Sequence, residues 1–467
     1  MLGFLQAVLS GVFFWLGFAP FQWWFAPFVG AALLFHTLAK NKLGRRVPLC
    51  FISGVTFFLF LLHWSSTYVG AIPWLILAFG QAAFFLLLGI FPIHYTPAGA
   101  ITFASVFTLV EIIRMKLPFG GFGWGRLGFT QVDNLSPLYS FIGVTGITFV
   151  VALSSLLLVK SRLRYIFILG VAISFFLPSF VGSTISNIRI TAVQGGVDKL
   201  GLDFNDRALS VLDRHVDVSQ TINDVDLIVW PENSSDVDPV KNALARTSIS
   251  DFISAKKIPL LIGAVESTDK GPLNTSLLYD NNGIIASRYV KQDLAPFGEY
   301  MPLRSLAEAI SRYATSVRDF QPGKSWVKHQ VKGIPFQSLI CFEILDDDHV
   351  RAGALGTGFL VAQTNNATFG TSSEAAQQLQ ITRARAAELG RDFVVASTTG
   401  FTTHIDRRGN IQEIAPQFEP RALAMKVSAV DPDQRTPASR IPSWIWVLLL
   451  GLVLLREVFS ALTLYRR

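Results

Sequence analysis

The feature that most limits the fold of this chain is the grouping of its apolar residues into long runs near both ends. From residue 1 to 182 these runs are interrupted only by short polar segments, residues 187–440 have an ordinary mixed composition, and residues 441–455 are apolar again. The mean hydropathy is +0.42 and only 16% of residues are charged, which is too apolar for a soluble chain of this length. The sequence therefore predicts a membrane domain, an inserted soluble domain and one returning helix.

Several segments approach the roughly 20 apolar residues that a helix needs to cross a bilayer. They lie near residues 2–18, 23–39, 48–68, 72–92, 97–113, 137–159, 165–183 and 442–461. We expect the first to be retained, because it lacks the basic n-region and the cleavage site of a signal peptide. The predicted domains are seven transmembrane helices in residues 1–185, a soluble domain in residues 186–438, and a last transmembrane helix with a short tail in residues 439–467.

Basic residues indicate the orientation. They cluster at residues 40–46, 160–164 and 466–467, and all three clusters fall on one side of the membrane if both termini are cytoplasmic. The soluble domain is then extracytoplasmic. These flanking clusters largely explain the net charge of +7, so the charge does not indicate nucleic-acid binding.

One of the two cysteines, Cys341, lies in this soluble domain, in the stretch FQSLICFEILDDDH. Cysteines outside the cytosol usually occur in pairs. The other cysteine, Cys50, falls at the cytoplasmic start of a predicted span, where packing explains it. Cys341 is therefore either a small buried apolar residue or a thiol that is used.

Reactive side chains follow three predicted strands of the soluble domain. Glu232 comes after the apolar strand at residues 226–230, Lys291 closes the second strand of a hairpin around an Asn-Gly turn, and Cys341 follows the strand at residues 336–340. Together they permit a carboxylate to take the thiol proton, a thiolate to attack a carbonyl, and a cation to hold the oxyanion. Each residue alone is also explained by a solvated loop or a strand edge.

Other chemistries find little support in the sequence. The seven histidines show no paired-ligand spacing, and no Walker loop and no GxGxxG motif opens a helix. We therefore expect no metal and no cofactor. The acidic run at residues 346–348 is typical of a solvated helix start.

These residues resemble a known family. WPEN at residues 230–233, the lysine of YVKQDLAPFGEYMP and CFE at residues 341–343 resemble the nitrilase superfamily, which has a Glu-Lys-Cys triad in an αββα sandwich. Within it the chain is similar to the apolipoprotein N-acyltransferases, bacterial membrane enzymes that finish lipoproteins. The similarity extends over nearly the whole chain, with FAPF at 18–21, PFGGFGWGRLGFTQ at 118–131, PFGEYMP at 296–302 and RARAAELGR at 383–391. The fold class that follows is a multi-pass helical membrane domain plus an α/β nitrilase-like sandwich.

The resemblance implies a role for each site residue. Glu232 would be the general base, Cys341 the nucleophile and Lys291 the stabiliser of the transition state. Glu299 would be a supporting acid that orients the lysine. Phe342 and Glu343, just after the nucleophile, would shape the site.

Substrate recognition is less well defined. Phe342 stands where tyrosine is often expected, and Asn366 and Thr368 stand where the family commonly shows aspartate and tryptophan. Aromatic loops near the outer interface are candidates for an entrance or for an ordinary interface belt. Further candidates for substrate binding or a lid are Phe119 and Trp124 of the glycine-rich loop 119–125, Tyr300 and Asn365.

The implied reaction is a ping-pong acyl transfer. Cys341 would take an acyl chain from a membrane phospholipid as a thioester and pass it to the α-amino group of the diacylglyceryl-cysteine of a lipoprotein. We expect a monomer in the bacterial cytoplasmic membrane, with the bilayer, the phospholipid donor and the diacylated lipoprotein as its partners. The alternatives are a membrane-tethered nitrilase-type hydrolase and a non-catalytic partner of a lipid or glycan enzyme.

Overall fold

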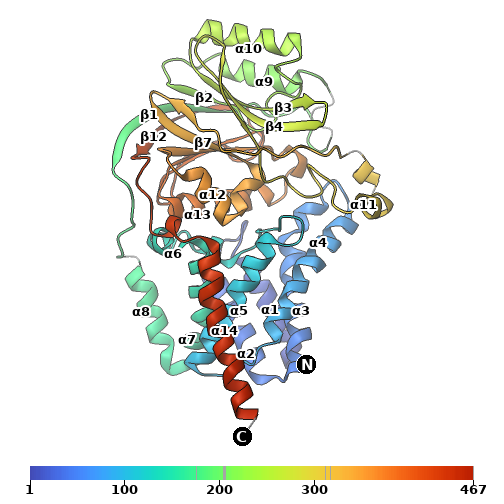
Figure 1. The fold of residues 1–467 in the computed structure, drawn as a ribbon, viewed down its shortest axis with the longest axis vertical. Coiled ribbons are helices and arrows are strands. Elements are labelled where there is room, and N and C mark those ends of the chain that lie inside the picture. Colours follow the sequence, from blue (N-terminus) through green and yellow to red (C-terminus); the bar gives the residue numbers. More distant parts are fainter. Residues whose placement is uncertain (175, 203–206, 311, 316, 466–467) are drawn as a thin grey trace. The chain divides into compact units, whose positions relative to one another are not determined.

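The computed structural model describes residues 1–467 apart from 175, 203–206, 311, 316 and 466–467. The chain divides into a helical unit, residues 1–180 with 437–467, and an α/β unit, residues 181–436 (Figure 1). The sequential order is therefore helical, then α/β, then helical again.

Apolar helices joined by short loops make up the helical unit. They are α1 (Leu2–Leu16), α2 (Ala26–Lys40), α3 (Leu43–Leu61), α4 (Ala71–Ala83), α5 (Pro97–Lys116), α6 (Ser136–Leu153), α7 (Ser155–Val159), α8 (Arg164–Ser174) and α14 (Ser443–Tyr465). Short 3-10 helices extend or link them: η1 (His63–Ser66), η2 (Phe84–Gly89), η3 (Leu127–Gln131), η4 (Ser161–Leu163) and η8 (Ala438–Arg440).

Within the described residues, four helical segments are long and apolar enough to cross a membrane. They are Leu43–Leu61, Ala71–Gly89, Pro97–Lys116 and Ser136–Val159. They match the predicted spans at 48–68, 72–92, 97–113 and 137–159, so the chain is a multi-pass membrane protein. The first two predicted spans are shorter apolar helices of 15 residues each.

The other two predicted spans remain predictions. The segment predicted at 165–183 begins as α8, but residue 175 lies outside the described residues, and β1 begins at Thr184. The segment predicted at 442–461 coincides with α14, which is 23 residues long.

Small residues let α1, α2 and α3 approach one another closely. A Cβ atom on Gly11 would lie 2.4 Å from the carbonyl oxygen of Ser53, so that contact requires glycine. Ser10 donates to the carbonyl of Gly30 at 2.9 Å, and Ser53 donates to Ser10 at 3.1 Å. Close packing and hydrogen bonds of this kind hold helices together in lipid, where apolar surface gives no net drive for association.

The α/β unit contains two six-stranded sheets. The first has the order β12-β1-β2-β3-β4-β5 and the second β11-β10-β9-β8-β7-β6. Strands of the first sheet are β1 (Thr184–Gln194), β2 (Leu227–Val229), β3 (Leu260–Thr268), β4 (Gly271–Tyr279), β5 (Ile285–Val290) and β12 (Arg421–Val430). Strands of the second are β6 (His329–Val331), β7 (Ile334–Ile340), β8 (Phe359–Thr364), β9 (Phe393–Ser397), β10 (Thr403–Ile405) and β11 (Ile411–Ile414).

Helices cover the outer faces of the two sheets (Figure 1). The inner faces share one apolar core, to which Ile190 and Leu227 contribute from the first sheet and Phe336 and Phe359 from the second. On the outer face of the first sheet, Trp230 packs in a second cluster with residues of α9 (Ser210–Ser219) and α10 (Ala243–Lys256). The second sheet is covered by α12 (Asp347–Ala354) and α13 (Glu374–Leu389). This αββα sandwich confirms the predicted fold class.

The central strands of the two sheets are parallel neighbours. β2 pairs in parallel with β1 and β3, and β8 pairs in parallel with β7 and β9. Since neighbouring parallel strands end at the same edge of a sheet, the loops that leave β2 and β7 each begin at such an edge. Glu232 and Cys341 lie on those two loops.

Candidate active site

The three residues predicted from strand ends lie directly beyond strands. Glu232 follows β2 after Trp230 and Pro231, and Lys291 is the first residue after β5. Cys341 is the first residue after β7 and begins the 3-10 helix η6 (Cys341–Leu345). Its φ of 49° lies in the left-handed region, which non-glycine residues rarely adopt, so the chain turns sharply at the thiol.

Lys291 lies between two carboxylates. Its Nζ is 2.8 Å from Oε2 of Glu299 and 3.6 Å from Oε1 of Glu232. Lys291 is only 1% exposed, and both acids are buried with it. A buried ammonium ion needs such partners, because its desolvation is otherwise prohibitive. The geometry therefore supplies the contact between Glu299 and the lysine that the resemblance implied.

Asn274, in the middle of β4, connects the same two acids. Its Nδ2 donates to Oε1 of Glu232 at 2.7 Å and to Oε1 of Glu299 at 2.8 Å. The backbone N–H of Asn365 donates to the other oxygen of Glu232 at 3.0 Å. Glu232 is thus held by a lysine, an amide and a backbone donor. The sequence analysis missed Asn274; its only signal was a polar residue inside a predicted strand.

Burial and charge set the protonation states of this cluster. Burial raises the pKa of Glu232, while the charge of Lys291 opposes that rise. Burial works against the charge of Lys291, but Glu299 and Glu232 outweigh it and raise the pKa of the lysine above its usual range. Burial, reinforced by the charge of Glu232, raises the pKa of the Cys341 thiol well above its usual value. At rest the lysine is charged and the thiol is neutral, so the thiol needs a base before it can attack.

Glu343 fixes the turn that carries the thiol. It is fully buried, and its Oε2 accepts from the backbone N–H of Ile340 at 2.7 Å. Its Oε1 accepts from the Tyr289 hydroxyl at 2.7 Å and from the Gln292 N–H at 2.8 Å, and it lies 3.2 Å from Nε2 of His349. These bonds join the turn after β7 to the residues around the end of β5. Lys291 is the first residue after that strand.

Charge again explains the state of Glu343. Burial alone would raise the pKa of Glu343, but His349 and the backbone donors outweigh burial and lower it. Burial likewise opposes the charge of His349, yet Glu343 and Asp293 raise the pKa of the histidine. Glu343 is therefore an ionised anchor rather than a proton donor. Its partners Tyr289 and His349 were not predicted from the sequence.

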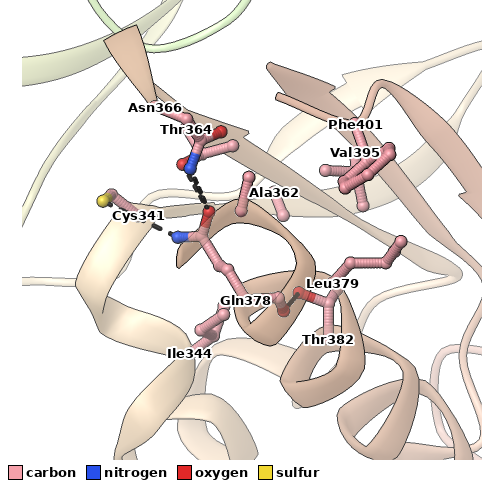
Figure 2. Close-up of a pocket in the computed structure, with 11 residues that line it drawn as sticks. Cys341, Ile344, Ala362, Thr364, Asn366, Gln378, Leu379, Thr382, Val395 and Phe401 are labelled. Atoms are coloured by element: carbon pink, nitrogen blue, oxygen red, sulfur yellow. Dashed lines mark hydrogen bonds between the residues drawn. The ribbon is translucent and has the colours of Figure 1, made fainter. Parts of the chain in front are cut away.

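A small cavity adjoins Cys341 (Figure 2). Its walls include the apolar side chains of Ile344, Ala362 and Phe401. Gln378 projects from α13 toward the thiol, and its Nε2 is 3.8 Å from Sγ of Cys341 (Figure 2). Gln378 is a second residue that the sequence analysis missed. Among the residues that the structure describes, no group of three His, Cys, Asp or Glu side chains is arranged to hold a metal ion.

The two lid candidates of the helical unit differ from each other. Phe119 is exposed, whereas Trp124 is buried, with its ring 5.1 Å from that of Trp64. The guanidinium of Arg114 donates to the carbonyls of Phe122 at 2.9 Å and Trp124 at 2.6 Å. The second half of the 119–125 loop is therefore held by α5, and a lid role for Phe119 stays a prediction.

The remaining candidates lie in the α/β unit. Asn365 reaches Glu232 through its backbone, and its side chain accepts from the N–H of Ala367 at 3.1 Å. Tyr300 closes the PFGEY loop, where its carbonyl accepts from the N–H of Phe297 at 2.8 Å. Phe342 is half-buried in η6. A role for these three in substrate binding stays a prediction.

The acidic run after Cys341 corrects one expectation. It does begin a helix, since Asp346 accepts from the N–H groups of Asp348 and His349 at 2.9 Å each, at the start of α12. The expectation that the run is solvated is wrong for Asp347, which is fully buried. Its Oδ1 is 2.8 Å from a guanidinium nitrogen of Arg385 on α13, and this ion pair compensates the burial.

Comparisons with protein families match both units. Residues 10–157 match the family model of the apolipoprotein N-acyltransferase N-terminal domain, and residues 189–432 match that of the carbon-nitrogen hydrolases. The second match alone spans more than half of the chain.

Among individual proteins, the chain is similar to an apolipoprotein N-acyltransferase of Mycolicibacterium smegmatis. The two are 32% identical over 468 residues, covering 89% of this chain and 78% of the relative. An apolipoprotein N-acyltransferase of Haemophilus influenzae is 28% identical over 486 residues, covering 93% of this chain and 90% of the relative.

Solved structures resemble part of the chain. A CN-hydrolase superfamily protein from Xanthomonas campestris is 16% identical with a TM-score of 0.40, covering 52% of this chain and 92% of its own. A nitrilase-superfamily amidase from Nesterenkonia is 18% identical with a TM-score of 0.41, covering 56% of this chain and 97% of its own.

Proposed function

Because the chain belongs to the apolipoprotein N-acyltransferase family, we propose that Glu232, Lys291 and Cys341 form its catalytic triad. The observation that carries this proposal is the buried cluster in which Lys291 contacts Glu232 and Glu299. The same lysine interacts electrostatically with the Cys341 thiol. A base, a cation and a nucleophile thus share one water-poor site, the arrangement that covalent acyl transfer needs.

In the first half-reaction Glu232 takes the thiol proton and the sulfur attacks the ester carbonyl of a membrane phospholipid. Lys291 stabilises the oxyanion that forms. When the carbon–oxygen bond breaks, the leaving alkoxide takes the proton back from Glu232 and departs as a lysophospholipid. The acyl chain is then a thioester on Cys341.

In the second half-reaction the free α-amino group of a diacylglyceryl-cysteine lipoprotein attacks the thioester. Glu232 takes a proton from the amine, an amide bond forms, and the carbon–sulfur bond breaks. The sulfur leaves as a thiolate and recovers the proton from Glu232. The products are an N-acylated lipoprotein and the resting enzyme, so one base serves both halves.

Three other residues position the triad in this proposal. Asn274 and Glu299 hold Glu232 and Lys291 at a fixed separation. Glu343 holds the turn that presents Cys341. Preorganisation of this kind matters because small displacements of a reacting group cost large factors in rate.

Water and amine are the two possible acceptors for the thioester, and one experiment separates them. The purified protein is loaded with an acyl chain from phospholipid, freed of donor, and then kept in buffer or given a diacylated lipopeptide. We expect the acyl-enzyme to persist in buffer and to be discharged by the lipopeptide, with the amide as product. Rapid loss in buffer alone would instead indicate a hydrolase.

A cell-based comparison tests the catalytic role against a non-catalytic one. Cys341→Ala should abolish N-acylation of lipoproteins when it replaces the parent protein, and Cys50→Ala should not. Unchanged N-acylation in the Cys341→Ala variant would contradict the triad and favour a partner role.

The placement in the membrane is also part of the proposal. The basic clusters at residues 40–46 and 160–164 favour cytoplasmic termini and an extracytoplasmic catalytic unit in a monomer. Cysteine labelling from outside intact spheroplasts, at a residue introduced into the exposed Asn281–Gly283 turn, tests this orientation. Labelling only after the membrane is permeabilised would place the catalytic unit on the cytoplasmic side.

A further inference from the structure

We propose that Gln378 is a positioning residue whose amide N–H donates to the sulfur of Cys341. This inference rests on the proposed function of Cys341 as the nucleophile. Gln378 projects from α13, is nearly fully buried, and lies 3.8 Å from the sulfur through its Nε2 (Figure 2). Lys291 would act on the carbonyl oxygen of the substrate, whereas Gln378 would act on the sulfur.

The direction of the Gln378 amide follows from a chain of hydrogen bonds that starts at a backbone donor. The N–H of Gly400 donates to Oγ of Ser397 at 2.8 Å, which leaves the Ser397 hydroxyl hydrogen to donate elsewhere. It donates to Oδ1 of Asn366 at 2.6 Å. A backbone N–H can only donate, so this end of the chain fixes the Ser397 oxygen as the acceptor of Gly400.

The orientation of the Asn366 amide in turn fixes that of the Gln378 amide. Because Oδ1 of Asn366 accepts from Ser397, its Nδ2 faces the other way and donates to Oε1 of Gln378 at 2.9 Å. Thr364 donates to the same Oε1 at 2.8 Å. Two donors on Oε1 leave Nε2 of Gln378 facing the sulfur, so the thiol meets an N–H and not a carbonyl.

Glu374 completes the chain on the far side of Asn366. Its Oε2 accepts from Nδ2 of Asn366 at 2.7 Å. Burial raises the pKa of Glu374 to about 8, so the carboxyl is largely neutral at pH 7. A neutral Glu374 still accepts from Asn366, and when it ionises at higher pH its charge raises the pKa of the Cys341 thiol.

A donor at the sulfur helps at the two moments when the sulfur carries most charge. These are the formation of the thiolate before the first attack and its departure as a leaving group in the second half-reaction. A hydrogen bond to a charged acceptor is stronger than one to a neutral acceptor, so the bond stabilises both states relative to the thiol. Asn366, which departs from the family pattern, therefore supports the nucleophile through Gln378.

Alkylation of Cys341 by iodoacetamide measures this effect without any acyl donor. The rate is followed against pH on the full-length protein in detergent, with mass mapping of the Cys341 peptide to exclude Cys50. Gln378→Met keeps the size of the side chain and removes the donor. Gln378→Glu keeps the size and the acceptor for Asn366 and Thr364, but presents an oxygen to the sulfur.

We expect alkylation at pH 7 to slow by about tenfold in Gln378→Met and by more in Gln378→Glu, with the titration of the thiol moved to higher pH. The control is Gln377→Met, a buried glutamine of the same helix whose amide donates to Ser373, and it should stay within about twofold of the parent. Circular dichroism and thermal unfolding exclude misfolded variants. If one Gln378 variant misfolds, the other decides.

The proposal is overturned if both Gln378 variants fold and alkylate like the parent, or if Gln377→Met slows alkylation as much as they do. Such a result leaves the triad untouched, because alkylation does not use Glu232-assisted acyl transfer from phospholipid. Conversely, if the parent protein forms no acyl-enzyme, the proposed function is wrong. The parent could still be alkylated faster than the two Gln378 variants, as the role of Gln378 predicts. The two failures are therefore distinguishable.

Discussion

Two clusters of buried charges, one in each unit, look alike in composition but differ in construction. In the helical unit, Nε of Arg126 lies 3.6 Å from Oε2 of Glu111. Glu111 also accepts from the N–H of Leu127 at 2.8 Å and from Thr148 at 2.6 Å. In the α/β unit, Lys291 lies between Glu232 and Glu299.

The two clusters differ in the groups that their cations contact. Arg114, one turn along α5 from Glu111, donates to the carbonyls of Phe122 and Trp124, so the helical cluster holds backbone in place. Arginine suits such fixed, multiple contacts, whereas lysine is a compact point charge. The lysine of the α/β cluster interacts electrostatically with the Cys341 thiol. We therefore propose a catalytic role for the buried charges that lie beside Cys341 and a structural role for those of the helical unit.

The largest effect that distinguishes the clusters is expected from Glu232→Gln. This change keeps the shape of the side chain but removes the base, so the acyl-enzyme should form about 10²–10⁴-fold more slowly. Single-turnover mass spectrometry measures the rate. Glu111→Gln is the matched variant in the helical cluster. A comparable loss of the chemical step in Glu111→Gln would contradict a purely structural role for that cluster.

Arg126→Met should act on stability instead. It breaks the buried ion pair of Glu111 and leaves the weaker interaction of that carboxylate with Arg114. Breaking a buried pair destabilises a protein by about 3–5 kcal/mol. Thermal unfolding in detergent measures the loss, and adding Glu111→Gln should recover part of it. If Arg126→Met leaves stability unchanged, the helical cluster is not a structural one.

Asn274→Leu should have a smaller effect, confined to the catalytic cluster. It removes the donor shared by Glu232 and Glu299 and leaves both with one hydrogen bond fewer, which costs about 1–3 kcal/mol. We expect acyl-enzyme formation to slow by roughly tenfold to a hundredfold, since 1.4 kcal/mol corresponds to a factor of ten. A variant that keeps the parental rate would show that the lysine and the backbone donors of Asn365 and Ala295 position the two acids without Asn274.

The smallest expected effect is on the pH dependence of acyl-enzyme formation. Burial raises the pKa of Glu232, and a base works only when it is deprotonated, so acyl-enzyme formation should decline as the pH falls through that raised pKa. The acid limb should therefore lie above the roughly 4.3 of an exposed glutamate. Because Asn274 lowers the pKa of Glu232, Asn274→Leu should move this limb to higher pH. A limb that does not move would assign it to another group.

The resemblance to the nitrilase superfamily predicted the sandwich. The strand pattern predicted the positions of Glu232, Lys291 and Cys341, because residues that follow short apolar strands lie at sheet ends. It did not reveal Asn274 or Gln378, since a polar residue within a strand or a helix is ordinary until its tertiary neighbours are known. The burial of Asp347 was missed for the same reason. Its cation, Arg385, is 38 positions away in the sequence and meets it only through the packing of α13 on α12.

Intact mass measurement tests whether Cys341 carries the acyl chain. The purified parent protein and Cys341→Ala are incubated with phospholipid of one defined acyl composition, and each is then treated with hydroxylamine. We expect one acyl adduct on the parent, mapped to the Cys341 peptide and removed by hydroxylamine, and none on the variant. An adduct of the same mass on Cys341→Ala, or a parent protein that N-acylates lipopeptide without passing through an adduct, would contradict this role of Cys341.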